Sequence, residues 1–402
     1  MKVLVLCNKS PYPPKEGGPI AMNAIIEGLL NAGHQVKVLA INSNKYGVDV
    51  KDIPEEYRHK THIETVYIDL SIKPVDAFFN LFTGKSYHVE RFISKAFREK
   101  LIKILSNETF DIVQMETLFI SPYIETIRKY SKARIILRAH NIEHLIWERV
   151  SQITTNPLKK LYLKHLAKTL KRYELGVLSK FDGICTITAK DGEFFIKQGC
   201  QVPMVAIPFG INLEKIKENH GIEAEFPSLF HIGAMNWMPN EEGIKWFLEK
   251  VWPLVNQANP DLKFYIAGRE MPDWLNQMQL PNVVVVGEVA DAFDFMYSKA
   301  IEVVPLFSGS GIRIKIIEGM AAARAIISTT IGAEGINVSD GENILLADDP
   351  EAFALAVQRC VDDEQFTQTL GENARNLIRK EHSNREIISR MTDFYHTVIV
   401  RQ

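Results

Sequence analysis

A glycine turn followed by two cations and a carboxylate is the strongest candidate for chemistry in this sequence. The turn comes soon after the apolar run Ile301–Leu306, and a helix-like run begins where it ends. Its residues, with the charged ones that follow, are Gly309, Ser310, Gly311, Arg313, Lys315 and Glu318. Glycine lets the backbone approach a ligand closely, and the free N–H groups at a helix start favour an anion. The stretch therefore predicts an anion site.

The spacing of the charged residues narrows the expected ligand. Lys315 and Glu318 are three positions apart and share a helix face. Phosphates beside the cations and a hydroxyl-bearing ring beside Glu318 would engage every polar group, which predicts a nucleotide diphosphate with its ribose. The alternative is an ordinary turn with a surface Lys–Glu pair. Cations at a helix start oppose the helix dipole, and this conflict favours the functional interpretation.

A second glycine turn lies near the start of the chain. Gly17 and Gly18 follow the apolar run Val3–Cys7 and precede a helix-like run, Ile20–Leu30. Their backbone N–H groups would offer donors to an anion. The turn lacks the GxGxxG pattern of dinucleotide sites, so a flexible proline-rich loop is the alternative.

A histidine marks the end of a predicted strand in the stretch RAHNIEH. His140 comes two residues after the strand-like run Arg134–Arg138, and ligand-binding residues collect at such strand ends in α/β sheets. The alternative is a histidine with a structural role. His144 lies four positions later, but HNIEH is not the HExxH pattern of zinc hydrolases, so no zinc hydrolase is predicted.

Strand-like and helix-like runs alternate along most of the chain and define the fold class. One of the helix-like runs between the strands covers Glu241–Asn256. Apolar strands separated by helices predict parallel sheets covered on both faces. Further strand-like runs are Val36–Ile41, Thr65–Leu70, Ile112–Met115, Gly183–Thr188, Met204–Ile207, Leu229–Ile232, Lys263–Ala267, Val283–Val286 and Ala325–Ser328. The pattern predicts two Rossmann-like domains, with a cleft between them as the default ligand site.

The predicted limits follow a break in this alternation. Residues 1–208 form the first domain and 228–383 the second domain. Residues 209–227 form a linker, which contains Gly210, a charged stretch, Gly221 and Pro227. Residues 384–402 form a C-terminal helix that could pack back on the first domain. A chain of 402 residues is long enough for two such domains.

The overall charge and the cysteines exclude several classes of protein. A net charge of −2 argues against a dedicated nucleic-acid binder. The four cysteines form no CxxC pair, so neither zinc binding nor redox chemistry is predicted. The N-terminal apolar run is too short for a signal peptide, and no run of about 20 apolar residues occurs. We therefore expect a cytoplasmic protein.

A basic helix-like stretch covers residues 158–173. It combines six cations with leucines at helical spacing and contains no acidic residue. Such a helix could contact an anionic membrane from the cytoplasmic side. The alternative is a solvated outer helix of the first domain, and the sequence leaves both open.

Taken in order, these motifs resemble retaining GT-B glycosyltransferases of family 4 over nearly the whole chain. The resemblance rests on MKVLVLCNKSPYPPKEGG, RAHNIEH, PFGIN, HIGAMNWMPNEEG, VVVVGEV and the stretch IEVVPLFSGSGIRIKIIEGMAAARAIISTTIGAEGI. It implies a nucleotide-sugar donor held by the second domain and a glycan, lipid-linked or small-molecule acceptor on the first.

The resemblance also assigns roles to single residues. Glu318 matches the second glutamate of a Glu-x7-Glu motif and would hold the ribose, while His140 matches a histidine near the donor sugar. Gly17 and Gly18 match a loop near the diphosphate and the acceptor. Ser310 stands where the family has the first glutamate, so the sequence does not name the donor sugar.

The family's usual cations after the first strand of the second domain are missing, since no Lys or Arg lies between Gly233 and Gly243. We expect Arg313 and Lys315 to supply that charge to the leaving diphosphate. No DxD triplet and no close carboxylate pair is evident, so a front-face route that requires no metal or other cofactor is expected. The alternatives are a nucleotide-sugar epimerase of this fold and a non-catalytic nucleotide-sugar-binding protein.

Overall fold

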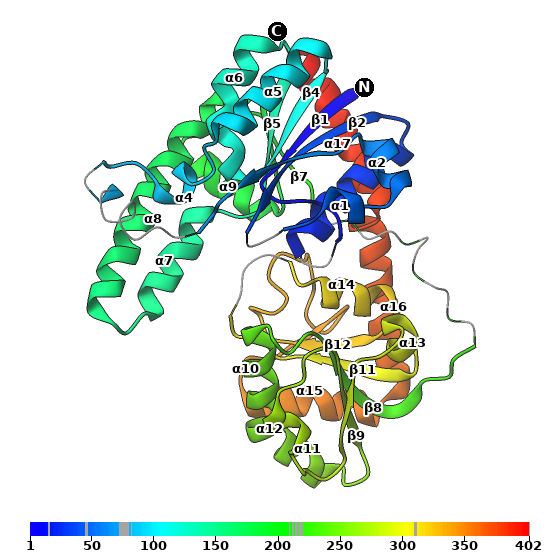
Figure 1. Cartoon of the computed structure of the whole chain (residues 1–402). Coiled ribbons are helices and arrows are strands. Elements are labelled where there is room, and N and C mark those ends of the chain that lie inside the picture. The colour runs from blue at the N-terminus through cyan, green and yellow to red at the C-terminus, as the bar shows by residue number, and fades with distance from the viewer. Residues whose placement is uncertain are drawn as a thin grey trace. The chain divides into compact units, whose positions relative to one another are not determined.

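The computed structural model describes residues 1–14, 17–44, 47–71, 80–81, 83–208, 221–308 and 312–401, together with residues 210, 213, 216 and 219. The chain forms two compact units (Figure 1). Unit 1 comprises residues 1–210 and 387–402, and unit 2 comprises residues 211–386. The C-terminal residues thus belong to the same unit as the N-terminal ones.

Unit 1 is built on a seven-stranded parallel sheet in the order β3-β2-β1-β4-β5-β6-β7. Its strands are β1 (Lys2–Cys7), β2 (Gln35–Ser43), β3 (Glu64–Ile68), β4 (Ile112–Glu116), β5 (Arg134–Ala139), β6 (Gly183–Thr186) and β7 (Met204–Ala206). The central strands are apolar and almost fully buried because helices cover both faces of the sheet. All carboxyl ends meet at one edge, which places the ends of β4 and β5 side by side.

The helices of unit 1 divide between the two faces of its sheet. One hydrophobic cluster joins β1 and β2 to α1 (Gly17–Asn31) and α17 (Asn384–Val400). The other joins the opposite strand faces to helices that include α5 (Lys95–Asn107), α6 (Ile124–Tyr130) and α9 (Ala189–Lys197). Shorter helical segments are α2 (Glu55–Thr61), α4 (Tyr87–Glu90) and the 3-10 turns Val50–Asp52, Leu118–Tyr123 and Leu178–Lys180.

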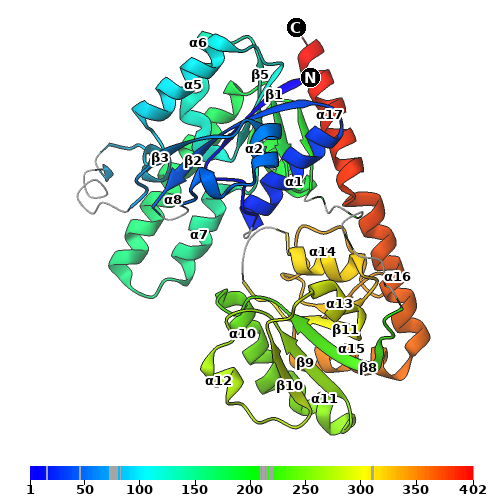
Figure 2. The ribbon, with the colours of Figure 1, turned by 45° about the vertical axis from the view of Figure 1, so that its right-hand side comes forward.

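A helical hairpin follows β5. It consists of α7 (Glu143–Ile153) and α8 (Pro157–Val177), which lie side by side in both ribbon views (Figure 2). The Asn156 side chain caps α8 by accepting a hydrogen bond from the backbone N–H of Lys159 at 3.0 Å, and Pro157 fits the first turn. The hairpin therefore begins its second helix at a well-defined point.

Unit 2 contains a six-stranded parallel sheet in the order β10-β9-β8-β11-β12-β13. Its strands are β8 (Glu225–Ile232), β9 (Lys263–Ala267), β10 (Val283–Gly287), β11 (Lys299–Val304), β12 (Ala325–Ser328) and β13 (Leu345–Leu346). Strand β8 begins at Glu225, inside the segment predicted as linker. Half of the rest of that segment, residues 209–224, lies outside the described residues.

The helices of unit 2 follow its strands in regular alternation. They are α10 (Met238–Trp246), α11 (Trp252–Ala258), α12 (Asp273–Asn276), α13 (Ala292–Tyr297), α14 (Ile314–Ala321), α15 (Pro350–Asp362) and α16 (Glu364–Glu381). The predicted helix 241–256 is interrupted by a π-turn, Phe247–Val251, just before a proline. Two parallel sheets with helices on their faces confirm the predicted α/β fold class.

Candidate functional site

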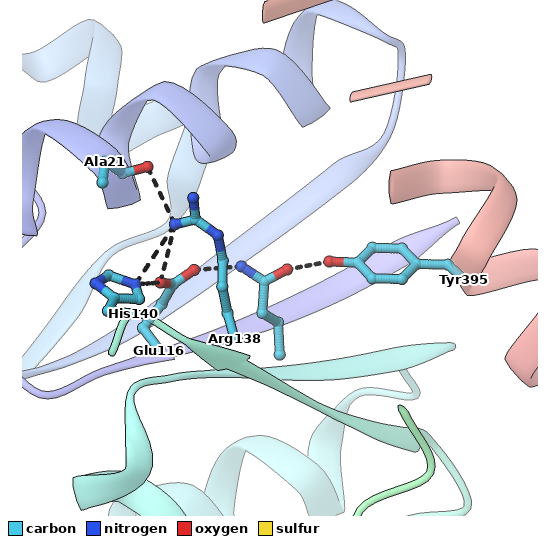
Figure 3. A network of polar contacts seen from close by, with 6 residues as sticks. Ala21, Glu116, Arg138, His140 and Tyr395 are labelled. Atoms are coloured by element: carbon cyan, nitrogen blue, oxygen red, sulfur yellow. Dashed lines mark hydrogen bonds and ion pairs between the residues drawn. The ribbon is translucent and has the colours of Figure 1, made fainter. Parts of the chain in front are cut away.

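His140 lies one residue beyond β5 and is bonded to a buried carboxylate. Its Nε2 atom is 2.5 Å from Oε2 of Glu116, the last residue of β4 (Figure 3). The side chain of Glu116 is fully buried, whereas that of His140 keeps 12% of its surface exposed. The adjacent register of β4 and β5 brings these two residues together.

Arg138 is the cation that pairs with the buried carboxylate of Glu116. Its Nη1 atom lies 3.4 Å from Glu116 Oε2 and 3.4 Å from the backbone carbonyl of Ala21 in α1. Burial alone would raise the pKa of Glu116, but the attraction of Arg138 and the hydrogen bond of His140 outweigh it, so this pKa is lowered. The carboxylate is therefore ionised and accepts hydrogen bonds.

The protonation state of His140 follows from the same contacts. Burial lowers its pKa, the bond to Glu116 opposes this effect, and the net shift is downward. A neutral imidazole carries one N–H, and the ionised Glu116 fixes that proton on Nε2. The Nδ1 atom is then left with a lone pair that can accept a hydrogen bond.

The network continues to the C-terminal helix. Gln114 Nε2 donates to the second carboxylate oxygen of Glu116, and the Tyr395 hydroxyl of α17 donates to Gln114 Oε1. All three side chains are buried. His140 is thus connected through two side chains of β4 to the C-terminal helix α17.

A second cluster surrounds Lys315 in unit 2. Its Nζ atom donates to Asn240 Oδ1 at 2.7 Å and lies 3.2 Å from His231 Nε2. His231 is fully buried and donates from Nδ1 to the Val303 carbonyl at 2.8 Å, which leaves Nε2 as the acceptor for Lys315. Burial and the adjacent cation hold the pKa of His231 well below its usual range. These neutral partners therefore fix Lys315 without cancelling its charge.

Two carboxyl groups accompany Lys315. Glu302, in β11, is fully buried, and neither of its oxygens has a hydrogen-bond partner among the described residues. Burial raises its pKa, while burial lowers that of Lys315. Burial also raises the pKa of Glu318 to about 7. These three titratable groups influence one another, so an added anion would change their protonation.

Two glycines pack against this cluster. A Cβ atom at Gly233 would collide with Lys315 Nζ, and one at Gly319 would collide with Glu302 Oε2. The loop after β8 and the helix α14 therefore both lie directly against the ionisable groups. A side chain at either position would have to displace these groups, so glycine permits the close approach.

Arg313 stands at the start of α14, as predicted. It is 4% exposed, and its guanidinium lies 6.0 Å from the ring of Trp237. Arg313 is therefore a largely buried cation. The remaining residues of the predicted turn, Gly309, Ser310 and Gly311, lie outside the described residues.

The N-terminal glycine turn is the start of α1. Gly17 and Gly18 are its first two residues, and a Cβ atom at Gly18 would lie 2.9 Å from Lys9 Cε. The same helix supplies the Ala21 carbonyl that contacts Arg138. The glycine turn therefore begins the helix, α1, that contacts the His140 network.

His144 has a separate, structural environment. It is fully buried, and its Nδ1 atom lies 2.6 Å from Glu174 Oε2. The same carboxylate accepts the backbone N–H groups of Glu143 and His144 and so caps α7. Across the described part of the chain, no group of three or more His, Cys, Asp or Glu side chains is arranged to hold a metal ion.

One protein-family model matches most of unit 2. Residues 226–363 match the family model described as Glycosyl transferases group 1. This match contains the whole Lys315 cluster.

Two relatives extend the likeness along the chain. An uncharacterised 44.6 kDa protein in the cps region of Klebsiella pneumoniae is 22% identical over 399 residues, which cover 96% of this chain and 98% of that protein. The capsular polysaccharide biosynthesis glycosyltransferase CapM of Staphylococcus aureus is 24% identical over 204 residues, covering 47% and 53% of the two chains.

A solved structure shows the same fold over both units. The Anabaena protein HepE in complex with UDP aligns with a TM-score of 0.67 at 13% identity, covering 99% of this chain and 100% of its own. The chain therefore adopts the GT-B fold. Together with the family model and CapM, this shows an enzyme that transfers sugars, as the sequence motifs predicted.

Proposed function

We propose that the protein is a retaining glycosyltransferase of family 4 type that moves a sugar from a nucleotide-diphosphate sugar to a glycan or lipid-linked acceptor. The relatives from a cps region and from capsular polysaccharide biosynthesis support a role in polysaccharide assembly. The UDP bound by HepE supports a nucleotide-diphosphate donor. The observation that carries the proposal is the cation Lys315, held by neutral partners at the start of α14.

Lys315 and Arg313 are the proposed diphosphate ligands. Cleavage of the bond between sugar and phosphate develops negative charge on the leaving diphosphate, and fixed cations stabilise that charge without reorganising. Asn240 and His231 hold Lys315 in place before the donor arrives. The turn residues Gly309, Ser310 and Gly311 would add donors beside the same phosphates.

Glu318 is the proposed ribose ligand. It lies one helical turn beyond Lys315 on α14, so a diphosphate beside the cation would bring the ribose hydroxyls toward this carboxylate. An ionised carboxylate is the stronger acceptor for those hydroxyls. Donor binding should therefore favour the ionised form of Glu318.

His140 is the proposed ligand of a sugar hydroxyl, with Glu116 positioning it. Because Nε2–H is committed to Glu116, Nδ1 is available as an acceptor. In a front-face reaction the departing phosphate oxygen takes the proton of the acceptor hydroxyl, so His140 need not act as a base. Gly17 and Gly18 would offer backbone N–H groups to the phosphate or the acceptor.

Incubation with a panel of UDP-, GDP- and ADP-sugars tests the function. A glycosyltransferase forms a new glycoside with retained anomeric configuration only when an acceptor is supplied. An epimerase would release free nucleotide and an altered sugar without an acceptor, and a binding protein would bind a nucleotide sugar without converting it. An inverted product would contradict the retaining mechanism alone.

A further inference from the structure

The outer face of α8 exposes two large apolar side chains at the far end of the hairpin. Leu158 is 80% exposed and Leu161 is 69% exposed. The inner face of the same helix is buried through Leu163, Leu166 and Leu170. The two exposed leucines are therefore not needed for the packing of this helix.

A row of cations continues the same face toward the base of the hairpin. Lys164, Lys168 and Arg172 follow Leu161 at spacings of three and four residues, so they lie along one side of the helix. All three are exposed, and none has an acidic partner within ion-pair distance among the described residues. The neighbouring Lys171 differs, since it lies 3.8 Å from Glu148. The row thus carries uncompensated positive charge.

A cavity of about 430 Å³ opens where the row ends at Arg172. Hydrocarbon from Val89, Ile93 and Pro122 lines it, together with Arg172. Lys85 and Glu90 also line it and form an ion pair at 3.2 Å. The Ser86 hydroxyl, which also lines it, is 2% exposed and has no hydrogen-bond partner among the described residues. The cavity therefore combines an apolar wall with the cation of Arg172, the Lys85–Glu90 ion pair and one hydroxyl that has no partner among the described residues.

These features together fit an amphiphile with an anionic head group. A nucleic acid would leave the two leucines in water, and inorganic phosphate would leave the apolar cavity unused. A lipid bilayer would engage the two leucines, the row of cations and the cavity. The cations would contact head groups, and the apolar side chains would enter the interface.

We propose that the outer face of α8, from Leu158 to Arg172, docks the protein on an anionic lipid bilayer and that the adjoining cavity takes one lipid chain. The proposal rests on the surface alone and does not depend on which sugar is transferred. Among the described residues, no helix is both long and apolar enough to cross a membrane, so the attachment proposed here is peripheral.

Co-sedimentation of the full chain with vesicles tests the docking. Vesicles of phosphatidylglycerol mixed with phosphatidylcholine should pellet the protein at low salt, and vesicles of phosphatidylcholine alone should pellet far less. Binding should fall at 1 M salt, where the Debye length shrinks to about 3 Å. Equal pelleting with both vesicle types, or none with either, would overturn the proposal.

Charge reversal on the row provides the matched comparison. Lys164→Glu combined with Lys168→Glu should lower the vesicle partition coefficient at least about tenfold. Lys103→Glu combined with Lys132→Glu removes two exposed lysines elsewhere in unit 1 and should leave it nearly unchanged. A similar loss in both double variants would show only an effect of net charge and would refute the assigned surface.

Two further variants locate the lipid. The fluorescence of a Leu161→Trp variant should be quenched by brominated phosphatidylglycerol, unlike that of Leu355→Trp, whose parent side chain is 71% exposed in unit 2. Ile93→Trp narrows the cavity from its exposed rim and should reduce retention of phosphatidylglycerol in native mass spectrometry. Absence of quenching at position 161 would exclude insertion, and unchanged retention would exclude the cavity.

Discussion

Each unit has one fully buried glutamate on a central strand, and the two glutamates differ in their hydrogen bonding and in the direction of their pKa shift. Glu116 in β4 has both oxygens bonded, to His140 and Arg138 on one side and to Gln114 on the other. Glu302 in β11 has neither oxygen bonded among the described residues. The pKa of Glu116 is lowered, and that of Glu302 is raised.

The difference teaches how burial selects a protonation state. A buried charge is tolerated when cations and donors surround it, and otherwise the group becomes neutral. Glu116 is the first case and serves to orient His140. Glu302 is the second, and it shares its surroundings with Lys315 and Glu318, so this cluster is set to respond when an anion binds.

The largest expected effect is on Glu116. Glu116→Ala leaves Arg138 buried without its carboxylate and should reduce the free energy of unfolding by about 3–5 kcal/mol. Urea denaturation measures this value. A loss below about 1 kcal/mol would show that the network is not the compensated pair described here.

Loss of the cations in unit 2 should act on catalysis. Lys315→Ala or Arg313→Ala should remove about 2–4 kcal/mol of transition-state stabilisation. Steady-state kinetics with the productive donor measure kcat/KM for each variant. Unchanged kinetics in both would exclude these residues as diphosphate ligands.

Replacement of Glu318 should weaken the donor and alter its pH dependence. Glu318→Ala should cost about 1.5–3 kcal/mol in donor binding. Because the pKa of Glu318 in the free protein is about 7, wild-type affinity should fall as the pH drops below that value, and Glu318→Gln should remove this fall. Donors lacking the ribose 2′- or 3′-hydroxyl that bind as tightly as the natural donor would refute the ribose role.

Glu302 should tolerate a neutral replacement that Glu116 does not. The pKa of Glu302 is higher in the folded protein than in the unfolded chain. At a pH between these two values the folded state binds more protons than the unfolded state, so the free energy of unfolding falls as the pH rises through this range. Glu302→Gln should change stability by about 1 kcal/mol or less at low pH and flatten this decline. Thermal unfolding across the pH range measures it, and a steeper decline in the variant would contradict the comparison.

A similarly small effect is expected at the far end of the unit 1 network. Tyr395→Phe removes the donor to Gln114 and should cost about 0.5–1.5 kcal/mol in stability. Denaturation in urea measures this cost beside Glu116→Ala. A loss as large as that of Glu116→Ala would mean that α17 contributes more to the network than one hydrogen bond.

The alternation of apolar strands and helices was enough to predict the fold class, because buried parallel strands carry a strong sequence signal. It missed β13, whose two residues are too few for any periodicity. It also predicted one continuous helix over residues 241–256, where the structure has a π-turn before Pro253. These misses are local, and neither changes the order of the layers.

The site was less accessible from the sequence. Lys315 and His140 were named from their positions after a turn and a strand, but their partners were not. Glu116 ends a strand that was predicted to stop at Met115, and Tyr395 lies 281 residues from Gln114. The register of β4 and β5 brings Glu116 to His140, and the packing of α17 on the sheet brings Tyr395 to Gln114. A polar residue at the end of a predicted central strand is the one signal that could have pointed to Glu116.

Calorimetric titration of UDP, GDP and ADP tests the central claim most directly, that the Lys315 cluster binds the donor diphosphate. Each titration is repeated in buffers of different ionisation enthalpy, near pH 8. We predict that the nucleotide that binds to the wild type will drive net proton uptake, because its diphosphate favours the charged form of Lys315. Lys315→Met should weaken binding and abolish the proton uptake. Equal binding and equal proton uptake by the wild type and Lys315→Met would contradict the account.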